Sequence, residues 1–286
     1  MKKLFTFFAL SAIVLSMASC GDGNAPEANK VPEGAISGKF TVGEGKQVYF
    51  SKGNLRATYN ENKWKWLFAE HQWNYIGYGA ANNAIKNNGT IQFKDTVDLF
   101  GWSTDATNYG INNSKIPNTY YGGFKDWGNT IGDGWYTLSN DEWHYLLFER
   151  NDAAHLFGMG NVNNINGVIL LPDDWAGEKF TDTDNGLVQG SSAYQSADQI
   201  NNFDFHILDT DTWSSMEEKG AVFLPAADYR WAVEMQGLGQ YARYWTSTKV
   251  NEDEAYYIAF NFSYLKTDEV TTRAWGHSVR LVHNAE

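Results

Sequence analysis

Short apolar or alternating runs, separated by Gly and Asn, constrain most strongly what this chain can fold into. The runs cover residues 47–50, 55–59, 64–68, 168–171, 221–224, 241–246, 255–262 and 278–282. Runs of this length that are rich in aromatic and β-branched residues are typical of strands, and Gly and Asn are typical of the turns between them. The sequence therefore predicts a domain that is built from many short strands.

Helical signals are fewer. Ser139 and Glu142 have the S-x-x-E spacing of a capping box and are followed by apolar residues at helical spacing, which predicts a helix over residues 139–150. A second short helix is predicted over residues 212–218, ending before Gly220. Two main helices and many short strands indicate the α+β class.

Two other features organise the middle of the chain. Long stretches rich in Asn, Asp, Gly and Thr lie at residues 101–133 and 173–209, where the sequence predicts irregular loops. Two similar segments, 167–172 and 220–225, each run from Gly through apolar residues to Pro. They predict two buried strands that end at the same relative place, because Pro cannot donate to a strand ladder.

The chain begins with an export signal that ends at its only cysteine. Lys2 and Lys3 precede an apolar run over residues 4–14 and small residues before Cys20. This run is too short to span a bilayer, and the pattern is typical of a signal peptide over residues 1–19 with Cys20 as the acceptor of a lipid anchor. Met17 departs from the usual lipobox, which leaves an ordinary secretory peptide as the alternative.

The predicted organisation is a signal peptide over residues 1–19, a lipidated flexible tether over 20–39 and one domain over 40–286. The tether is predicted because Gly, Asn, Ala, Pro and acidic residues follow Cys20, a composition that buries little apolar surface. No Pro-rich or Ser-rich linker divides the rest. We expect the domain to be held at the membrane of the bacterial cell envelope, as an outer-membrane lipoprotein.

Charge argues against nucleic acid as a partner. Removal of residues 1–19 leaves 20 basic and 34 acidic side chains, a formal charge of −14. Phosphate binding needs clustered Lys and Arg, and the mature chain has no such cluster. With one cysteine, the chain also forms no internal disulfide.

Several motifs follow one another in an order that resembles a known family. They are VYFSKGNL at 48–55, WNYIG at 73–77, DLFGW at 98–102, GWYTL at 134–138, EW at 142–143, YWTST at 244–248 and SVRLV at 278–282. The set resembles the Fibrobacter succinogenes major paralogous domain family and related surface lipoproteins of Bacteroidetes. That family is similar to the C-type-lectin-like fold in its formylglycine-generating-enzyme variant. The resemblance implies an α+β fold whose long loops build a ligand face.

The resemblance does not extend to formylglycine-generating activity. Those enzymes work through active-site cysteines, and no cysteine follows Cys20 in this chain. Thiolate chemistry needs a thiol, so we expect a protein that is not an enzyme of that kind.

In related lectin-like scaffolds the ligand contacts cluster on the last segment. By position, this implies a ligand-binding face made of Tyr241, Arg243, Tyr264, Arg273, Trp275 and His277. Aromatic rings with hydrogen-bond donors beside them suit the binding of sugars. The alternative for Tyr241 and Trp275 is a place in the core, which is also the expected place of Trp143 and Trp245.

Calcium is the one cofactor that the sequence leaves open. Asp182 and Asp184 alternate before a Gly turn, as oxygen ligands of calcium loops do, and 209–211 and 251–254 are further acidic segments. Each has a solvated turn as its alternative. The six His residues have no paired spacing that would indicate zinc.

The sequence favours a lipid-anchored envelope protein that presents a lectin-like face to a glycan or protein ligand. One alternative is an envelope enzyme that acts on polysaccharide. Asp173 and Asp174 do not indicate one, because adjacent residues of an extended segment point in opposite directions. The other alternative is a structural or assembly lipoprotein without a small ligand.

Overall fold

The computed structural model describes residues 30–60, 63–77, 96–102, 123–181, 187–190, 193–196, 202–231, 234–237 and 239–285. The chain divides into two compact units, Met1–Lys30 and Val31–Glu286. The predicted export signal and Cys20 lie outside the described residues, and the fold below is that of the second unit. Among the described residues, no helix has the length and apolar character needed to cross a membrane.

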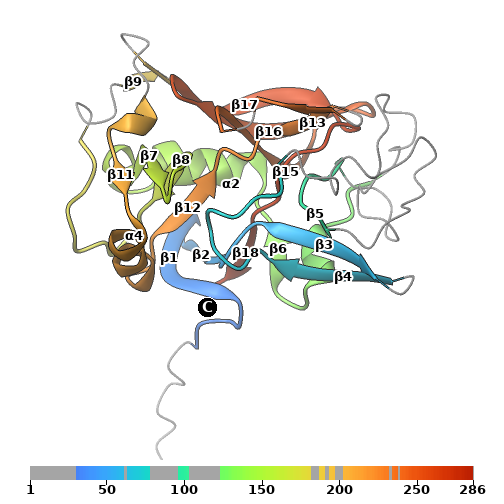
Figure 1. Cartoon of the computed structure of the whole chain (residues 1–286), viewed down its shortest axis with the longest axis horizontal. Coiled ribbons are helices and arrows are strands. Elements are labelled where there is room, and N and C mark those ends of the chain that lie inside the picture. The colour runs from blue at the N-terminus through green and yellow to red at the C-terminus, as the bar shows by residue number, and fades with distance from the viewer. Residues whose placement is uncertain are drawn as a thin grey trace, which may run out of the picture. The chain divides into compact units, whose positions relative to one another are not determined.

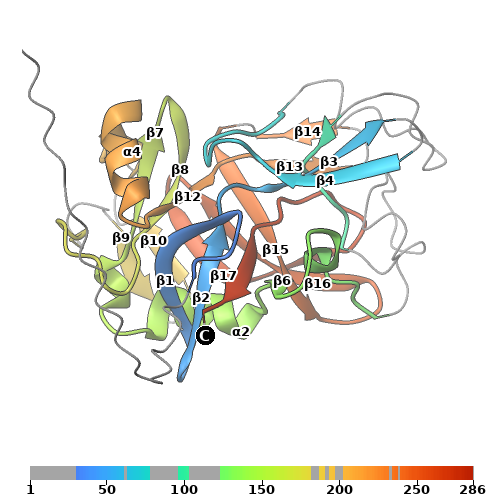
Figure 2. The same cartoon turned by 90° about the horizontal axis from the view of Figure 1, so that it is seen from below.

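The first sheet brings the first and last strands of the domain together (Figure 2). Its order is β1 (Ala35–Gly43), β2 (Lys46–Ser51), β18 (Leu281–Asn284) and β6 (Trp135–Thr137), with antiparallel neighbours. Alternate residues of β1, among them Ile36 and Phe40, enter the core. The domain therefore begins before residue 40, and residues 35–39 are strand rather than tether.

The second sheet carries the candidate site on one of its faces. Its order is β15 (Tyr241–Lys249), β16 (Glu254–Asn261), β17 (Tyr264–Thr272), β10 (Ala193–Ser196) and β9 (Leu187–Gly190). Tyr244, Phe260 and Leu265 lie on the face that packs into the largest core cluster. β9 and β10 lie inside the stretch 173–209, which was predicted to be irregular; β10 forms because it pairs with β17.

The third sheet contains the two similar segments of the sequence. Its order is β11 (Ile207–Leu208), β7 (Phe157–Val162), β8 (Ile165–Leu170) and β12 (Val222–Pro225). β8 and β12 are direct antiparallel neighbours, with Val168 opposite Leu224. Pro225 is the last residue of β12, as predicted, whereas Pro172 lies two positions beyond the end of β8.

Two smaller sheets complete the strands. One has the order β4 (Lys63–Phe68), β3 (Leu55–Asn60) and β5 (Thr96–Val97), and the other pairs β13 (Tyr229–Trp231) with β14 (Glu234–Gln236). β4 lies at the outside of its sheet with β3 beside it (Figure 1). The aromatic rings of Trp102, Trp127 and Trp245 belong to the core cluster beneath the three-stranded sheet.

The two α-helices within the described residues lie where the sequence predicts them. α2 (Asn140–His144) continues into a π-helical turn (Tyr145–Glu149), and both bonds of the predicted capping box between Ser139 and Glu142 are present. α4 (Thr210–Glu218) is capped by Asp209 and ends before Gly220. Shorter 3₁₀ turns cover Trp127–Thr130, Ala153–His155 and Asn202–Asp204. The α+β class is confirmed.

A buried polar network joins three of the sequence motifs. Asn54 Nδ2 donates to the Tyr244 hydroxyl at 3.1 Å, and that hydroxyl donates to the Pro225 carbonyl at 3.0 Å. Arg280 donates to Gln72 and, at 3.4 Å, to Asn54. Burial lowers the pKa of Arg280 to about 10. Buried polar groups cost free energy unless they are paired, so these motif residues have a structural role.

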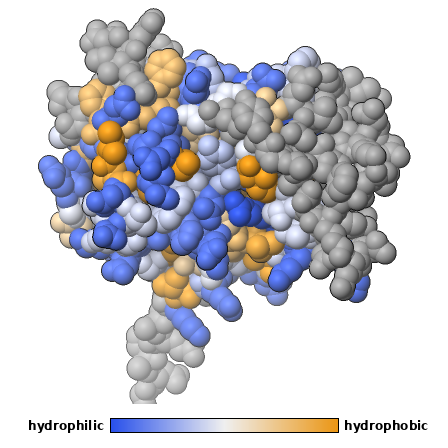
Figure 3. Space-filling model, viewed as in Figure 1, coloured by the Kyte–Doolittle hydropathy of each residue, from blue (hydrophilic) through white to orange (hydrophobic). Residues whose placement is uncertain are grey.

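The face seen in Figure 3 is mixed, with hydrophilic residues around small, separate hydrophobic patches. Trp143 and Trp245, predicted to be core residues, are both buried.

Candidate functional site

The candidate site lies on the face of the second sheet that is turned away from the largest core cluster. Directly paired residues of neighbouring strands share one face of a sheet. The register of β15, β16 and β17 therefore gives three rows on this face: Tyr241, Asn261 and Tyr264; Arg243, Ala259 and Lys266; and Trp245, Tyr257 and Glu269.

Arg243 lies at the centre of the face and is framed by aromatic rings. Its guanidinium carbon is 3.6 Å from the ring centroid of Tyr229, 5.2 Å from that of Tyr257 and 5.5 Å from that of Trp275. Tyr229 belongs to β13, and Trp275 follows β17. Cation–π contacts of this kind contribute roughly 0.5–1 kcal/mol each at exposed sites. The rings therefore hold the arginine in a defined place.

Two of the rings around Arg243 also contact each other. The rings of Tyr229 and Trp275 stack with their centroids 5.3 Å apart and an interplanar angle of 13°. Three separate parts of the chain, namely β13, β15 and the segment after β17, meet here.

The hydrogen-bond donors of Arg243 are not used within the described part of the chain. No hydrogen bond or ion pair of its guanidinium occurs there, and its side chain is half-buried. A guanidinium has five N–H donors in one plane, which suit oxygen acceptors such as carboxylates. The arrangement therefore presents unused donors between ring faces.

A second polar group lies beside the arginine. Lys266 Nζ is 3.1 Å from Glu269 Oε1, and the Tyr257 hydroxyl donates to Glu269 Oε2 at 3.4 Å. Lys266 also lies 5.2 Å from the ring centroid of Tyr264. Burial raises the pKa of Tyr257 to about 12, so this hydroxyl keeps its proton and acts as a donor at neutral pH.

Asp228 lies beneath the site, at the start of β13. It is buried and has φ of +69°, and the backbone N–H groups of Tyr229 and Gln236 lie beside its carboxylate. Burial raises the pKa of Asp228 to about 7, and the nearby charge of Arg243 acts in the opposite direction. This carboxyl therefore changes its charge near neutral pH.

His277 is not on the surface, which corrects its predicted role as a ligand contact. It is 0% exposed, and its ring stacks on Trp245 with centroids 4.1 Å apart and meets the edge of Tyr257 at 4.7 Å. Neither ring nitrogen has a hydrogen-bond partner among the described residues, and burial lowers its pKa well below the usual value. The backbone of Phe100 lies against that of His277, because the two residues form an isolated β-bridge. His277 supports the face from below as a neutral ring.

Arg273 is also buried, so its predicted role as a ligand contact is corrected as well. It is 0% exposed, its Nη1 donates to the Glu252 carbonyl at 2.8 Å, and its guanidinium carbon lies 4.6 Å from the Trp102 ring centroid. The contact with Glu252 joins the end of β17 to the turn before β16. Arg273 thereby holds a turn rather than a ligand.

The remaining predicted residues lie on one face. Tyr241, Arg243, Tyr264 and Trp275 are all half-buried, which gives each of them an exposed part. The sequence reasoning missed Tyr229 and Tyr257. Tyr257 could have been predicted, because alternation along the run 255–262 puts its side chain on the same face of the strand as Ala259. Tyr229 could not, because only tertiary packing brings β13 against β15.

The acidic segments 209–211 and 251–254, which are among the described residues, have structural roles. Asp209 accepts a hydrogen bond from Thr212 N at 2.8 Å as the cap of α4, and Asn251 Oδ1 accepts from the backbone of Asp253 and Glu254 in a turn. Asp182 and Asp184 lie outside the described residues. Within the described ranges no group of three or more His, Cys, Asp or Glu is placed to hold a metal ion.

Asp173 is likewise part of the scaffold. Its carboxylate accepts from Thr41 Oγ1 at 2.6 Å and from Gln47 Nε2 at 2.9 Å, and it forms an ion pair with the buried Arg150 at 3.1 Å. Asp174 is exposed.

Comparisons of the chain with protein-family models, with curated proteins and with solved structures find no match.

Proposed function

We propose that this protein is a lipid-anchored binding protein of the bacterial cell envelope, which presents the face around Arg243 to an acidic glycan. The observation that carries the proposal is the guanidinium of Arg243, framed by three rings and without a hydrogen bond or ion pair in the described chain. The export signal and Cys20 support the anchor, and we place the domain in the C-type-lectin-like fold of the formylglycine-generating-enzyme type on its ordered motifs.

The chemistry of the face indicates which ligand it suits. The apolar face of a sugar ring packs on aromatic side chains, and planar donors bind its oxygens. A sugar carboxylate pairs with a guanidinium through two parallel N–H···O bonds, which are stronger than neutral hydrogen bonds. Arg243, over the ring of Tyr229 and beside that of Trp275, combines both features. A uronate-containing glycan is therefore the ligand class that this face fits.

The orientation of the acidic groups agrees with that choice. Glu269 is engaged by Lys266 and Tyr257, and Asp228 is buried. The charge nearest to a ligand on this face is thus the positive charge of Arg243.

A glycan array with the full chain in detergent micelles tests the proposal. We expect binding to uronate-containing glycans in preference to their neutral counterparts, and a loss of that binding in Arg243→Gln. Lys219→Gln, which removes one positive charge at an exposed position at the end of α4, is the matched control and should bind as the wild type does. An intact fold with no glycan bound, or equal binding by Arg243→Gln, would overturn the proposal.

A further inference from the structure

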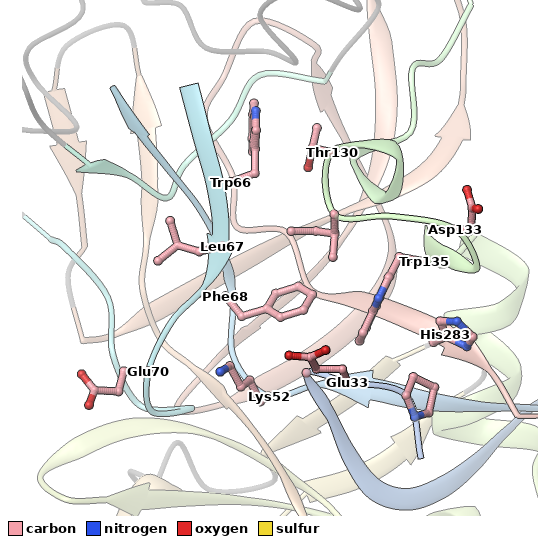
Figure 4. A pocket seen from close by; sticks show the side chains of 13 residues that line it. Glu33, Lys52, Trp66, Leu67, Phe68, Glu70, Thr130, Asp133, Trp135 and His283 are labelled. Atoms are coloured by element: carbon pink, nitrogen blue, oxygen red, sulfur yellow. The ribbon is translucent and has the colours of Figure 1, made fainter. Parts of the chain in front are cut away.

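A groove of about 700 Å³ lies between β4, β6 and the turn that leads into β1 (Figure 4). It shares no lining residue with the face around Arg243. Its size falls in the range of ligand sites in proteins, roughly 300–1,000 Å³. The lining side chains that bear on a ligand are two aromatic rings and the charged groups around them: Phe68, Trp135, Glu33, Glu70, Asp133 and Lys52.

The floor of the groove is aromatic and narrow. The rings of Phe68 and Trp135 are in contact, with centroids 4.8 Å apart, and these residues are 8% and 9% exposed. Both rings lie near the centre of Figure 4. Gly34 has φ of +84°, and a Cβ there would come within 3.1 Å of the Phe68 ring, so the glycine lets the backbone close over the floor. The small apolar surface that stays open suits a thin aliphatic chain, whereas a sugar ring needs an open aromatic face.

The rim of the groove carries more negative than positive groups. Glu33, Glu70 and Asp133 are exposed, and none of them forms an ion pair within the described ranges. Lys52 and His283 are the lining side chains that can carry a positive charge. Because the carboxylates outnumber the lysine, the groove complements a ligand with positive charge.

The carboxylates are spread along the groove. Glu70 follows the end of β4, and Asp133 lies in the turn before β6. Figure 4 shows these two side chains on opposite sides of the Phe68 ring. A single metal ion needs several oxygens that converge on one point, which this spacing does not provide. Two separate positive charges with an apolar chain between them match the spacing and the floor together.

We propose that this groove binds a linear aliphatic polyamine, in which methylene chains join the ammonium groups. The ammonium groups pair with Glu70 and Asp133, and the methylene chain between them lies on Phe68 and Trp135. An alkylammonium group donates several hydrogen bonds, and it is also attracted to aromatic rings, so both parts of the groove favour it. The site is independent of the glycan face, and each can fail without the other.

Isothermal titration of the full chain in nonionic detergent with spermidine tests the site. We expect saturable binding of spermidine, and much weaker binding of butylamine, which has one ammonium group. A series from tetramethylenediamine to decamethylenediamine should show an optimum length, because both ends must reach a carboxylate. Affinity that does not depend on length would overturn the proposal.

A second comparison tests the aromatic floor. Octamethylenediamine and its analogue with two ether oxygens in place of methylenes have the same charge and nearly the same length. The diamine without oxygens should bind more tightly, by about fivefold, because its apolar chain lies on Phe68 and Trp135. Equal affinity of the two would show that the floor takes no part, which contradicts the proposed mode of binding.

Matched variants separate the groove from the general attraction of an acidic protein for a cation. The double variant Glu70→Gln/Asp133→Asn should weaken spermidine binding by roughly two- to fivefold for each carboxylate. Asp174→Asn/Glu218→Gln removes the same charge at exposed positions elsewhere and should have little effect. Equal losses in both double variants would show nonspecific attraction. If glucosamine oligomers or a blocked lysine–glycine pentapeptide bind more tightly than spermidine, with the same dependence on Glu70 and Asp133, the polyamine proposal is wrong.

Discussion

The guanidinium carbon of Arg243 lies 3.6 Å from the centre of the Tyr229 ring, although the two residues belong to strands of different sheets. The stacking partner of Tyr229 is Trp275, so the arginine is held by a pair of rings that are themselves in contact. This contact fixes the place of the one cation at the centre of the proposed glycan face.

The first prediction concerns the shape of that cation. Arg243→Lys keeps the charge but loses the planar set of donors and the stacking on Tyr229. We expect the affinity for a uronate-containing glycan to fall by about tenfold, which corresponds to about 1.4 kcal/mol, with the melting temperature changed little. Titration of the glycan that the array selects measures this loss. Full affinity in Arg243→Lys would show that charge alone is recognised.

The second prediction concerns the pH dependence of stability through Asp228. Burial raises its pKa to about 7, above the value of about 3.9 expected in the unfolded chain. The unfolded state then binds fewer protons between these values, so the free energy of unfolding falls as pH rises from about 4 to about 7. The groups that interact with this carboxyl are the backbone N–H groups of Tyr229 and Gln236, the guanidinium of Arg243 and the hydroxyl of Tyr75.

Asp228→Asn removes this titration. Asn tolerates the left-handed backbone of this position, so we expect the variant to be more stable than the wild type at pH 8, by on the order of 1–3 kcal/mol, and similar to it at pH 4. Urea unfolding at both pH values measures the difference. Parallel pH dependence of the two proteins would contradict the assignment to Asp228.

The third prediction concerns the buried hydroxyl of Tyr244. Tyr244→Phe removes the bond from Asn54 and the bond to the Pro225 carbonyl; it leaves the buried Asn54 Nδ2 donor unpaired, while the Pro225 carbonyl keeps its bond from Ala227 N. We expect a loss of about 1–3 kcal/mol in the free energy of unfolding. Tyr256→Phe is the matched control, since Tyr256 is half-buried and its hydroxyl has no such bonds within the described chain. Equal stability of the two variants would mean that the network adds nothing.

The fourth prediction concerns the anchor. Cys20→Ser keeps the predicted export signal but removes the sulfur that the proposed lipid anchor needs, so the protein should leave the membrane fraction and appear in the soluble envelope fraction. Fractionation followed by immunoblotting measures this. Persistence of Cys20→Ser in the membrane fraction would show that another feature holds the protein there.

The local sequence predicted the elements whose signals are local. The capping box of Ser139 and Glu142 set the start of α2, and alternation or apolar runs marked the cores of β2, β3, β4, β15 and β16. Tyr241 and Arg243, which the family resemblance predicted as ligand contacts by position, lie on one face of β15. These features depend on residues that are near one another in the chain, where helix and strand periodicity is decisive.

Other features depended on contacts between distant parts of the chain. Residues 35–43 form a strand because they pair with β2 and because Ile36 and Phe40 are buried in the core. The sequence had predicted a tether for residues 35–39 from the composition of the preceding residues. β10 forms by pairing with β17 across a long sequence separation. Ile36, Phe40 and Val42 do alternate in the first segment, but the short β10 has no such pattern of its own.

For the site, the sequence by itself determined which residue types gather near the end of the chain: rings, arginines and a histidine. Only the tertiary structure decided which of them reach the surface. His277 and Arg273 lie inside, against Phe100 and Trp102, whereas Arg243 and Trp275 keep an exposed part. Tyr229 and the buried Tyr257 frame Arg243 because β13 and β16 lie beside it. The physical reason is that exposure depends on which strand covers a residue, and that partner is chosen by long-range packing of the core.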